Sequence, residues 1–236
     1  MRPTLVLFDI DGTLVDTGGA GRLGLVASFR SVFGLDDIEG SASRVRFDGK
    51  TDPTIIADIA REAGIPEGEV EARYTDLQEA YLHALRKELA LPNARRRVMP
   101  GVRPLLDLLA ARPDVSLGLV TGNIEEGARA KLDAFGLNRY FVDGGFSSDH
   151  PERNEIARIA HQRLSRRAGF HFPVDRVMVI GDTELDVLCA RANGFRAIAV
   201  ESGWVPRERL LAADPDVLLS DLTDAGAVLA AMGLVE

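Results

Sequence analysis

The most constraining feature of this sequence is a short apolar run that ends abruptly in two carboxylates. The run Leu5–Phe8 is followed directly by Asp9, Asp11 and Gly12. Because the run is continuously apolar, it predicts a strand buried on both faces, as in a parallel sheet covered by helices. Two anions at the end of such a strand are costly unless a cation joins them, so the segment also indicates a functional site.

The same form recurs along the chain. Ser116–Val120 leads into Thr121-Gly122-Asn123, and Arg176–Ile180 leads into Gly181-Asp182-Thr183. Further strands, the second of them weaker, are predicted at Ala197–Val200 and Val217–Leu219, and helices at Val102–Ala111, Glu125–Phe135, Pro151–Ala168 and Leu185–Ala192. Strands alternating with helices of this length predict right-handed crossovers and a parallel α/β sheet. The functional crevice of such a sheet lies beyond the carboxyl ends of its strands.

One segment, from about Gly18 to Leu91, breaks this alternation. It contains no convincing buried strand, but helical patterns occur at Ala20–Phe33, Pro53–Ala63 and Glu67–Leu89. Glycine-rich and proline-containing sequences stand at its two ends. We therefore expect an all-helical cap domain over residues 18–91, inserted into an α/β core made of residues 1–17 and 92–236.

Charge and cysteine content narrow the class of partner. The chain has a net charge of −8, so it has no obvious attraction for nucleic acid or an anionic membrane. No apolar stretch approaches the ~20 residues of a membrane span, and carboxylates interrupt the first apolar run too early for a signal peptide. A single cysteine, Cys189, is typical of a reducing compartment. We expect a cytoplasmic protein that is a monomer or a homodimer.

The spacing of the carboxylates points to a metal. Asp9 and Asp11 would project to one side of an extended chain, with Gly12 permitting a sharp turn. Asp182 ends a second buried strand, and Asp186 lies one helical turn further on. Loop carboxylates are usually solvated, but aspartates at the ends of two buried strands favour a shared hard cation such as Mg²⁺.

A different chemistry follows the strand at 116–120. Thr121-Gly122-Asn123 combines a hydroxyl, a permissive glycine and a helix start, which can form a phosphate-binding corner. Taken alone, the same residues would also suit a plain helix N-cap with a turn glycine.

Together these motifs resemble the haloacid dehalogenase superfamily, and within it the phosphoglycolate phosphatase-like branch with a helical cap. The matching residues are Leu-Phe-Asp9-Ile-Asp11-Gly-Thr-Leu-Val-Asp16-Thr, Val-Thr121-Gly-Asn and Val-Ile-Gly181-Asp182-Thr-Glu-Leu-Asp186. Order and spacing agree over nearly the whole chain. The resemblance implies a Rossmann-like core, Mg²⁺ as cofactor and a small phosphorylated metabolite as substrate.

The resemblance also implies roles for individual residues. Asp9 would attack phosphorus and become an aspartyl-phosphate, while Asp11 would protonate the leaving alcohol and then activate water. Mg²⁺ would be held by Asp9, the backbone carbonyl of Asp11 and Asp182, with Asp186 in support. Thr121 would hydrogen-bond a phosphoryl oxygen. The other phosphate-binding residues expected in the core are Gly12, Gly122 and Asn123.

The sequence departs from the family pattern at one position, where a basic residue is expected. Family members usually have a lysine, often followed by Pro-x-Pro, that pairs with the nucleophile and the phosphate. No lysine follows Lys131, which is itself expected on a solvated helix face. Aligning Pro151 with the second proline places Ser148 at the lysine position. We predict that Arg153 is the functional cation, since a guanidinium pairs bidentately with phosphate and is always charged.

Within the cap, Gly49-Lys50-Thr51-Asp52 resembles the loop that faces the active site in this branch. The resemblance implies Lys50 and Thr51 as substrate contacts. The alternative is that the segment only provides a helix N-cap, at Asp52 before Pro53.

Several functions share these motifs. Hydrolysis of a small phosphomonoester, phosphoglycolate-like or a sugar phosphate, is the leading hypothesis. A phosphomutase or phosphotransferase would use the same aspartyl-phosphate, and a non-catalytic phosphate-binding protein is a further alternative. Dehalogenases dispense with the aspartate matching Asp11, and phosphonoacetaldehyde-cleaving relatives need a cap lysine for which only Lys50 is a candidate.

Overall fold

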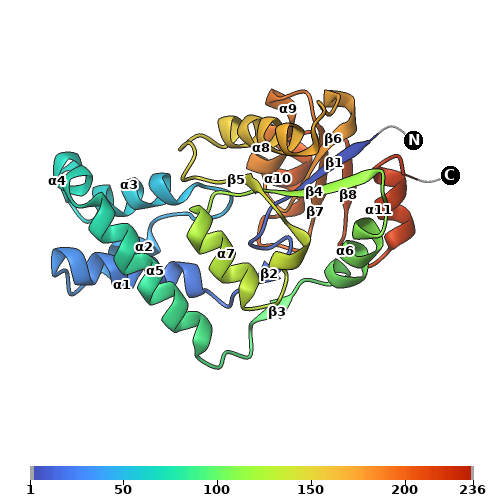
Figure 1. The fold of residues 1–236 in the computed structure, drawn as a ribbon. Helices are drawn as coiled ribbons and strands as arrows, with labels where there is room; N and C mark the ends of the chain where they lie inside the picture. The colour runs from blue at the N-terminus through green and yellow to red at the C-terminus, as the bar shows by residue number, and fades with distance from the viewer. Residues whose placement is uncertain (1–2, 235–236) are drawn as a thin grey trace.

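A six-stranded parallel sheet forms the centre of the computed structural model, which describes residues 3–234 (Figure 1). The strands are β1 (Thr4–Phe8), β4 (Val115–Val120), β5 (Gly144–Gly145), β6 (Val177–Gly181), β7 (Arg196–Val200) and β8 (Val217–Leu219). Their order is β5-β4-β1-β6-β7-β8. Because β1 lies between β4 and β6, the segments that leave these three strands meet at one edge of the sheet.

Helices cover both faces of this sheet, which explains the unbroken apolarity of its strands. Val6 and Phe8 of β1 belong to one hydrophobic cluster, whereas Leu5 and Leu7 belong to the cluster on the opposite face. The first face is covered by α6 (Val102–Ala110), α7 (Glu125–Asp133) and α11 (Ala225–Ala231). The second is covered by α8 (Arg153–Ala168), α9 (Glu184–Ala192) and α10 (Arg207–Ala212). Short 3-10 turns lie at Asn138–Tyr140 and Val174–Arg176.

A separate helical unit is inserted after β1. Its helices are α1 (Ala20–Phe33), α2 (Ile38–Ser43), α3 (Asp52–Glu62), α4 (Glu67–Ala72) and α5 (Tyr74–Ala90). They enclose their own hydrophobic cluster, which Ile124 joins from the start of α7. The predicted α/β core with a helical insertion is therefore confirmed. The helix predicted over residues 67–89 is divided at Arg73, and the short α2 was not predicted.

The two connections to this unit run side by side. Strands β2 (Val15–Asp16) and β3 (Arg97–Val98) form an antiparallel pair where the chain leaves and re-enters the core. Just beyond them, the Asn93 side-chain amide donates to the carbonyl of Gly18. The paired strands give the helical unit a narrow base.

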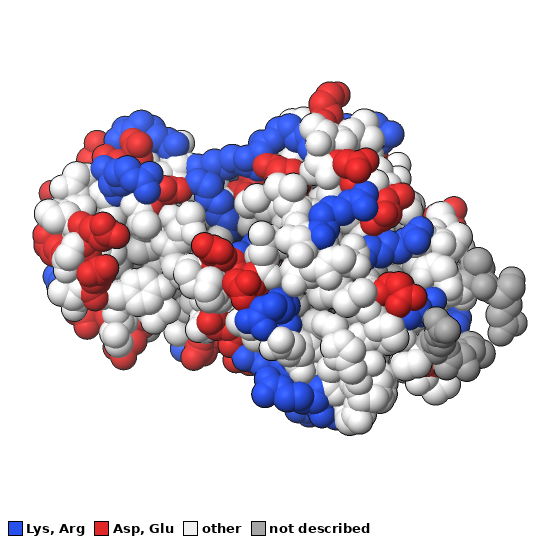
Figure 2. All heavy atoms as spheres, turned by 90° about the horizontal axis from the view of Figure 1, so that it is seen from above, with Lys and Arg blue, Asp and Glu red and all other residues white. Residues whose placement is uncertain are grey.

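On the face shown in Figure 2, acidic and basic side chains are interspersed over both lobes of the molecule, so charge does not single out a binding site on this face. Within residues 3–234, no helix is long and apolar enough to cross a membrane. A cavity lies between the sheet edge and the helical unit.

Candidate active site

Three buried carboxylates meet at the sheet edge. Asp9 follows β1, Asp182 follows β6, and Asp186 lies in the first turn of α9. One oxygen of each lies within 4.8 Å of the others. Burial raises the pKa of Asp9 to about 7, with Arg153 opposing and Asp186 adding to the effect, and burial likewise raises the pKa of Asp182 well above its usual range. Crowded oxygen ligands of this kind suit a divalent cation such as Mg²⁺.

The turn after Asp9 depends on glycine. Gly12 has a φ of +84°, and a Cβ there would lie 2.4 Å from a carboxylate oxygen of Asp182. Next to it, the Thr13 hydroxyl donates to Asp182 at 3.0 Å. The motif around Asp9 therefore packs directly on the end of β6, while the phosphate contact predicted for Gly12 stays a prediction.

Arg153 lies beside the proposed nucleophile. It is the first residue of α8, and its Nη2 donates to Asp9 Oδ1 at 2.7 Å and also to Asp186. Burial disfavours the guanidinium charge, but Asp186 and Asp9 raise the pKa of Arg153 well above its ordinary value. Ser148, at the family's lysine position, instead accepts a hydrogen bond from the backbone N–H of Glu125.

A second group of polar side chains joins the ends of β1 and β4. The Asn123 amide donates to Thr121 Oγ1 at 2.7 Å and to Asp11 Oδ2 at 2.9 Å. The ammonium of Lys131 donates to Asn123 Oδ1 and Asp11 Oδ2, both at 2.6 Å. The carboxylate of Asp11 is therefore bound by Asn123 and Lys131 and is not part of the cluster of buried aspartates. The metal contact that the resemblance implied for Asp11 involves its backbone carbonyl.

The prediction that Lys131 is solvated is wrong. Its side chain is buried, because α5 of the helical unit packs against α7 and covers the face that the helix pattern alone assigns to water. Sequence reasoning missed this residue. The available signal was scarcity, since only three of the 28 basic residues are lysines and Lys131 is the one that follows the second strand motif.

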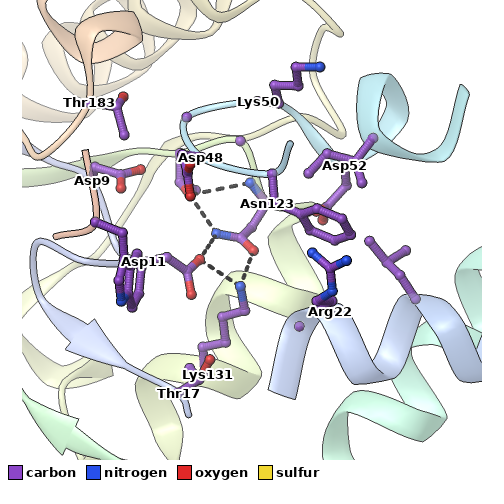
Figure 3. A pocket seen from close by; sticks show the side chains of 18 of the residues that line it. Asp9, Asp11, Thr17, Arg22, Asp48, Lys50, Asp52, Asn123, Lys131 and Thr183 are labelled. Carbon is purple, nitrogen blue, oxygen red and sulfur yellow. Dashed lines mark hydrogen bonds and ion pairs between the residues drawn. The ribbon is translucent and has the colours of Figure 1, made fainter. Parts of the chain in front are cut away.

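These groups surround a cavity of about 290 Å³ between the core and the helical unit (Figure 3). The core side of its wall includes Asp9, Asp11, Thr121, Gly122, Asn123, Lys131, Arg153 and Asp182, and the helical side includes Arg22, Phe47, Asp52, Ile55 and Tyr81. The guanidinium of Arg22 lies over the Phe47 ring, 4.7 Å from its centroid. A cavity of this size suits a small substrate.

The loop at 49–52 closes the helical unit onto the core. The Thr51 hydroxyl donates to the carbonyl of Pro151 at 2.8 Å. The backbone N–H of Asp52 donates to Gly122, and its carboxylate accepts from the N–H of Ile124 at 2.9 Å. Burial raises the pKa of Asp52 to about 6.

Lys50 differs from the other residues of this loop. Its ammonium pairs with Asp58 on α3 at 2.6 Å, and Figure 3 shows the side chain directed away from the cavity. Although Lys50 contributes to the cavity wall, the substrate contacts predicted for Lys50 and Thr51 stay predictions.

Comparisons with known proteins agree with the motifs. A family model described as a haloacid dehalogenase-like hydrolase matches residues 3–194. The chain is 32% identical to a probable phosphatase, IndB, of Dickeya dadantii, over 95% of this chain and 92% of that one. It is 31% identical to phosphoglycolate phosphatase 1 of Pseudomonas aeruginosa, over 94% and 78% of the two chains. A solved structure of CbbY from Rhodobacter sphaeroides in complex with phosphate has the same fold, with a TM-score of 0.73 at 22% identity and coverage of 95% and 97%.

Proposed function

This chain belongs to the haloacid dehalogenase-like hydrolases, as its motifs predicted, and on that premise we propose that it hydrolyses small phosphomonoesters through an aspartyl-phosphate on Asp9. The observation that carries the proposal is the placement of Asp9, whose carboxylate lies between the buried aspartates and Arg153 at the cavity wall. Relatives named as phosphatases, one of them a phosphoglycolate phosphatase, support a small phosphorylated substrate.

In the first step, a carboxylate oxygen of Asp9 forms a bond to phosphorus as the ester P–O bond breaks. Asp11 gives a proton to the departing alcohol oxygen. In the second step Asp11 takes a proton from water, whose oxygen bonds to phosphorus while the acyl-phosphate bond breaks. Inorganic phosphate and free Asp9 result. Arg153 and Thr121 bind the phosphoryl oxygens during both steps.

Mg²⁺ fits the carboxylate cluster because burial raises the pKa of two of its members and Arg153 alone does not balance their charge. Asp9, Asp182 and the backbone carbonyl of Asp11 would hold the ion. Asp186, already hydrogen-bonded to Thr183 and Arg153, would support it. When bound, Mg²⁺ offsets the repulsion between an anionic nucleophile and an anionic phosphate.

Residues 18–91 act in this proposal as a cap on the core made of 1–17 and 92–236, opening about the β2–β3 base to admit substrate. The size of the cavity favours a small leaving group, such as that of a phosphoglycolate-like or sugar phosphate.

The test is phosphate release from a panel of phosphomonoesters, including 2-phosphoglycolate, sugar phosphates and p-nitrophenyl phosphate, with Mg²⁺ and with a chelator. We expect Mg²⁺-dependent turnover and a phosphorylated peptide containing Asp9 after acid quenching. No turnover of any ester, with no adduct at Asp9, would leave a non-catalytic phosphate-binding protein. Phosphoryl transfer to added alcohols in preference to water would instead indicate a phosphotransferase.

A further inference from the structure

Lys131 has no role in the proposed reaction, yet it is hydrogen-bonded to residues that do. Its ammonium contacts Asp11 Oδ2 and Asn123 Oδ1, and the Asn123 amide contacts Asp11 Oδ2 and Thr121 Oγ1 (Figure 3). A lysine ammonium can only donate, so it fixes the Asn123 amide with Oδ1 toward Lys131 and Nδ2 toward Asp11. The network therefore links the proposed acid/base to the proposed phosphate-binding hydroxyl.

The two ends of the ion pair have different exposures. The Lys131 side chain is 5% exposed and the Asp11 side chain 32% exposed. A buried ammonium is costly without a partner, so Lys131 is expected to keep its contacts with Asp11 and Asn123. The Asp11 carboxylate, in contrast, is partly open to the cavity. Between the described residues, both hydrogen bonds to this carboxylate end on Oδ2.

Helix α1 leaves room for this arrangement. Gly21 lines the cavity, and a Cβ at this position would lie 3.2 Å from the Lys131 ammonium. A glycine near the start of a helix lowers helix stability, so its presence here is consistent with a need for space beside the ammonium.

We propose that Lys131 is a positioning residue for Asp11. Lys131 holds Oδ2 of Asp11 against α7, and this leaves Oδ1 of Asp11 facing the leaving-group oxygen. Arg153, beside Asp9, binds the phosphoryl group instead. Without this pair the carboxylate would populate other rotamers around the turn. The inference rests on the proposed function, because it assigns Asp11 as the acid/base of that reaction.

The test compares two leaving groups in the Lys131→Met variant, which removes the charge and keeps most of the packing. p-Nitrophenolate leaves without a proton, whereas an alkoxide needs one, and kcat/KM reports the steps up to cleavage of the ester bond. For an alkyl ester such as 2-hydroxyethyl phosphate we expect kcat/KM to fall on the order of 10²-fold, as for a misplaced acid/base. For p-nitrophenyl phosphate we expect kcat/KM to stay near that of the wild type.

Three results would overturn the proposal. An equal loss for both esters would show a general structural role or a phosphate contact, and no loss for either would show no role. A loss for 2-phosphoglycolate that is absent for 2-hydroxyethyl phosphate would make Lys131 a ligand of the substrate carboxylate. Turnover of p-nitrophenyl phosphate by the wild-type protein supports the proposed function whichever way this comparison falls.

A second variant guards against misfolding of Lys131→Met. Gly21→Ala favours helix α1 intrinsically and forces the ammonium to move by a few tenths of an ångström. We expect the same selective loss for the alkyl ester, smaller than in Lys131→Met, with an unchanged or higher melting temperature. Equal kcat/KM ratios in Gly21→Ala and wild type, at wild-type stability, would count against positioning by Lys131.

Discussion

The two carboxylates of one short motif are held by different parts of the molecule. Asp9 is buried, faces the aspartate cluster and pairs with Arg153 from α8. Asp11 is open to the cavity and pairs with Lys131 from α7. In the proposed reaction, Asp9 is fixed beside the phosphoryl group and the metal, and Asp11 faces the leaving group of the substrate. Each carboxylate therefore has its own basic partner, and the two pairs should fail in different ways.

The largest effect is expected on the Asp9 side. Asp9→Asn removes the nucleophile, so turnover should fall by at least about 10⁴-fold and no phosphorylated peptide should form. Because burial raises the pKa of Asp9, its charge opposes folding, and the variant should be as stable as the wild type or more so without Mg²⁺. Initial rates, peptide mass and thermal melting measure the three outcomes. Substantial turnover by this variant would remove Asp9 from the chemistry.

The next effect separates the two cations. Arg153→Ala should lower kcat/KM by on the order of 10²- to 10³-fold, since the phosphoryl oxygens lose a fixed donor. It also leaves Asp9 and Asp186 without their buried partner, at a cost of about 3 kcal/mol in the absence of metal. Mg²⁺ should restore part of that stability, giving a larger rise in melting temperature than in the wild type.

Two matched variants sharpen this result. Arg153→Lys keeps the charge but not the planar fork, so it should recover stability more than activity. Lys131→Met should leave the Mg²⁺-induced rise in melting temperature as it is in the wild type, because Lys131 contacts none of the clustered carboxylates. Arg153→Ala keeping more than about a tenth of wild-type kcat/KM would argue against the role assigned to Arg153.

The position of Arg153 was predicted correctly from the sequence and that of Lys131 was not, and this difference has a physical cause. Arg153 could be predicted because the resemblance places the family's cation just before a helix, within reach of an arginine in the first turn, and the structure places Arg153 against Asp9. The aspartates at the ends of β1 and β6 were predictable from the strand pattern itself. Their assembly needs only a parallel sheet, which apolar runs and intervening helices specify.

Lys131 depends instead on a contact between units that are far apart in sequence. Within α7 it lies in the last turn, where a basic residue ordinarily faces water and complements the helix dipole. The helical unit buries it, with α5 packed on α7 and Gly21 of α1 close to the ammonium. Asp52 is similar, since a residue that reads as a helix N-cap instead binds the start of α7. Such closure contacts have no periodic signature in the sequence.

The smallest effect is expected at that closure contact. Burial raises the pKa of Asp52 from 3.8 to about 6, with Lys131 and the Ile124 N–H opposing and Asp11 adding to the rise. The folded protein therefore binds the Asp52 proton more tightly than the unfolded chain. The stabilisation of the folded state that results is present below about pH 4 and is lost as the pH rises through about 6.

Asp52→Asn keeps an acceptor for the Ile124 N–H and removes the titration. The variant should therefore gain stability relative to the wild type between about pH 4 and 6, by on the order of 1–3 kcal/mol, with the gain constant above that range. Chemical denaturation across this pH range measures the difference. Asp58→Asn on the same helix is the control of opposite sign, because the pairing of Asp58 with Lys50 and Arg61 lowers its pKa. That variant should lose stability relative to the wild type as the pH rises, and parallel curves for both variants would contradict an ionisable closure contact at Asp52.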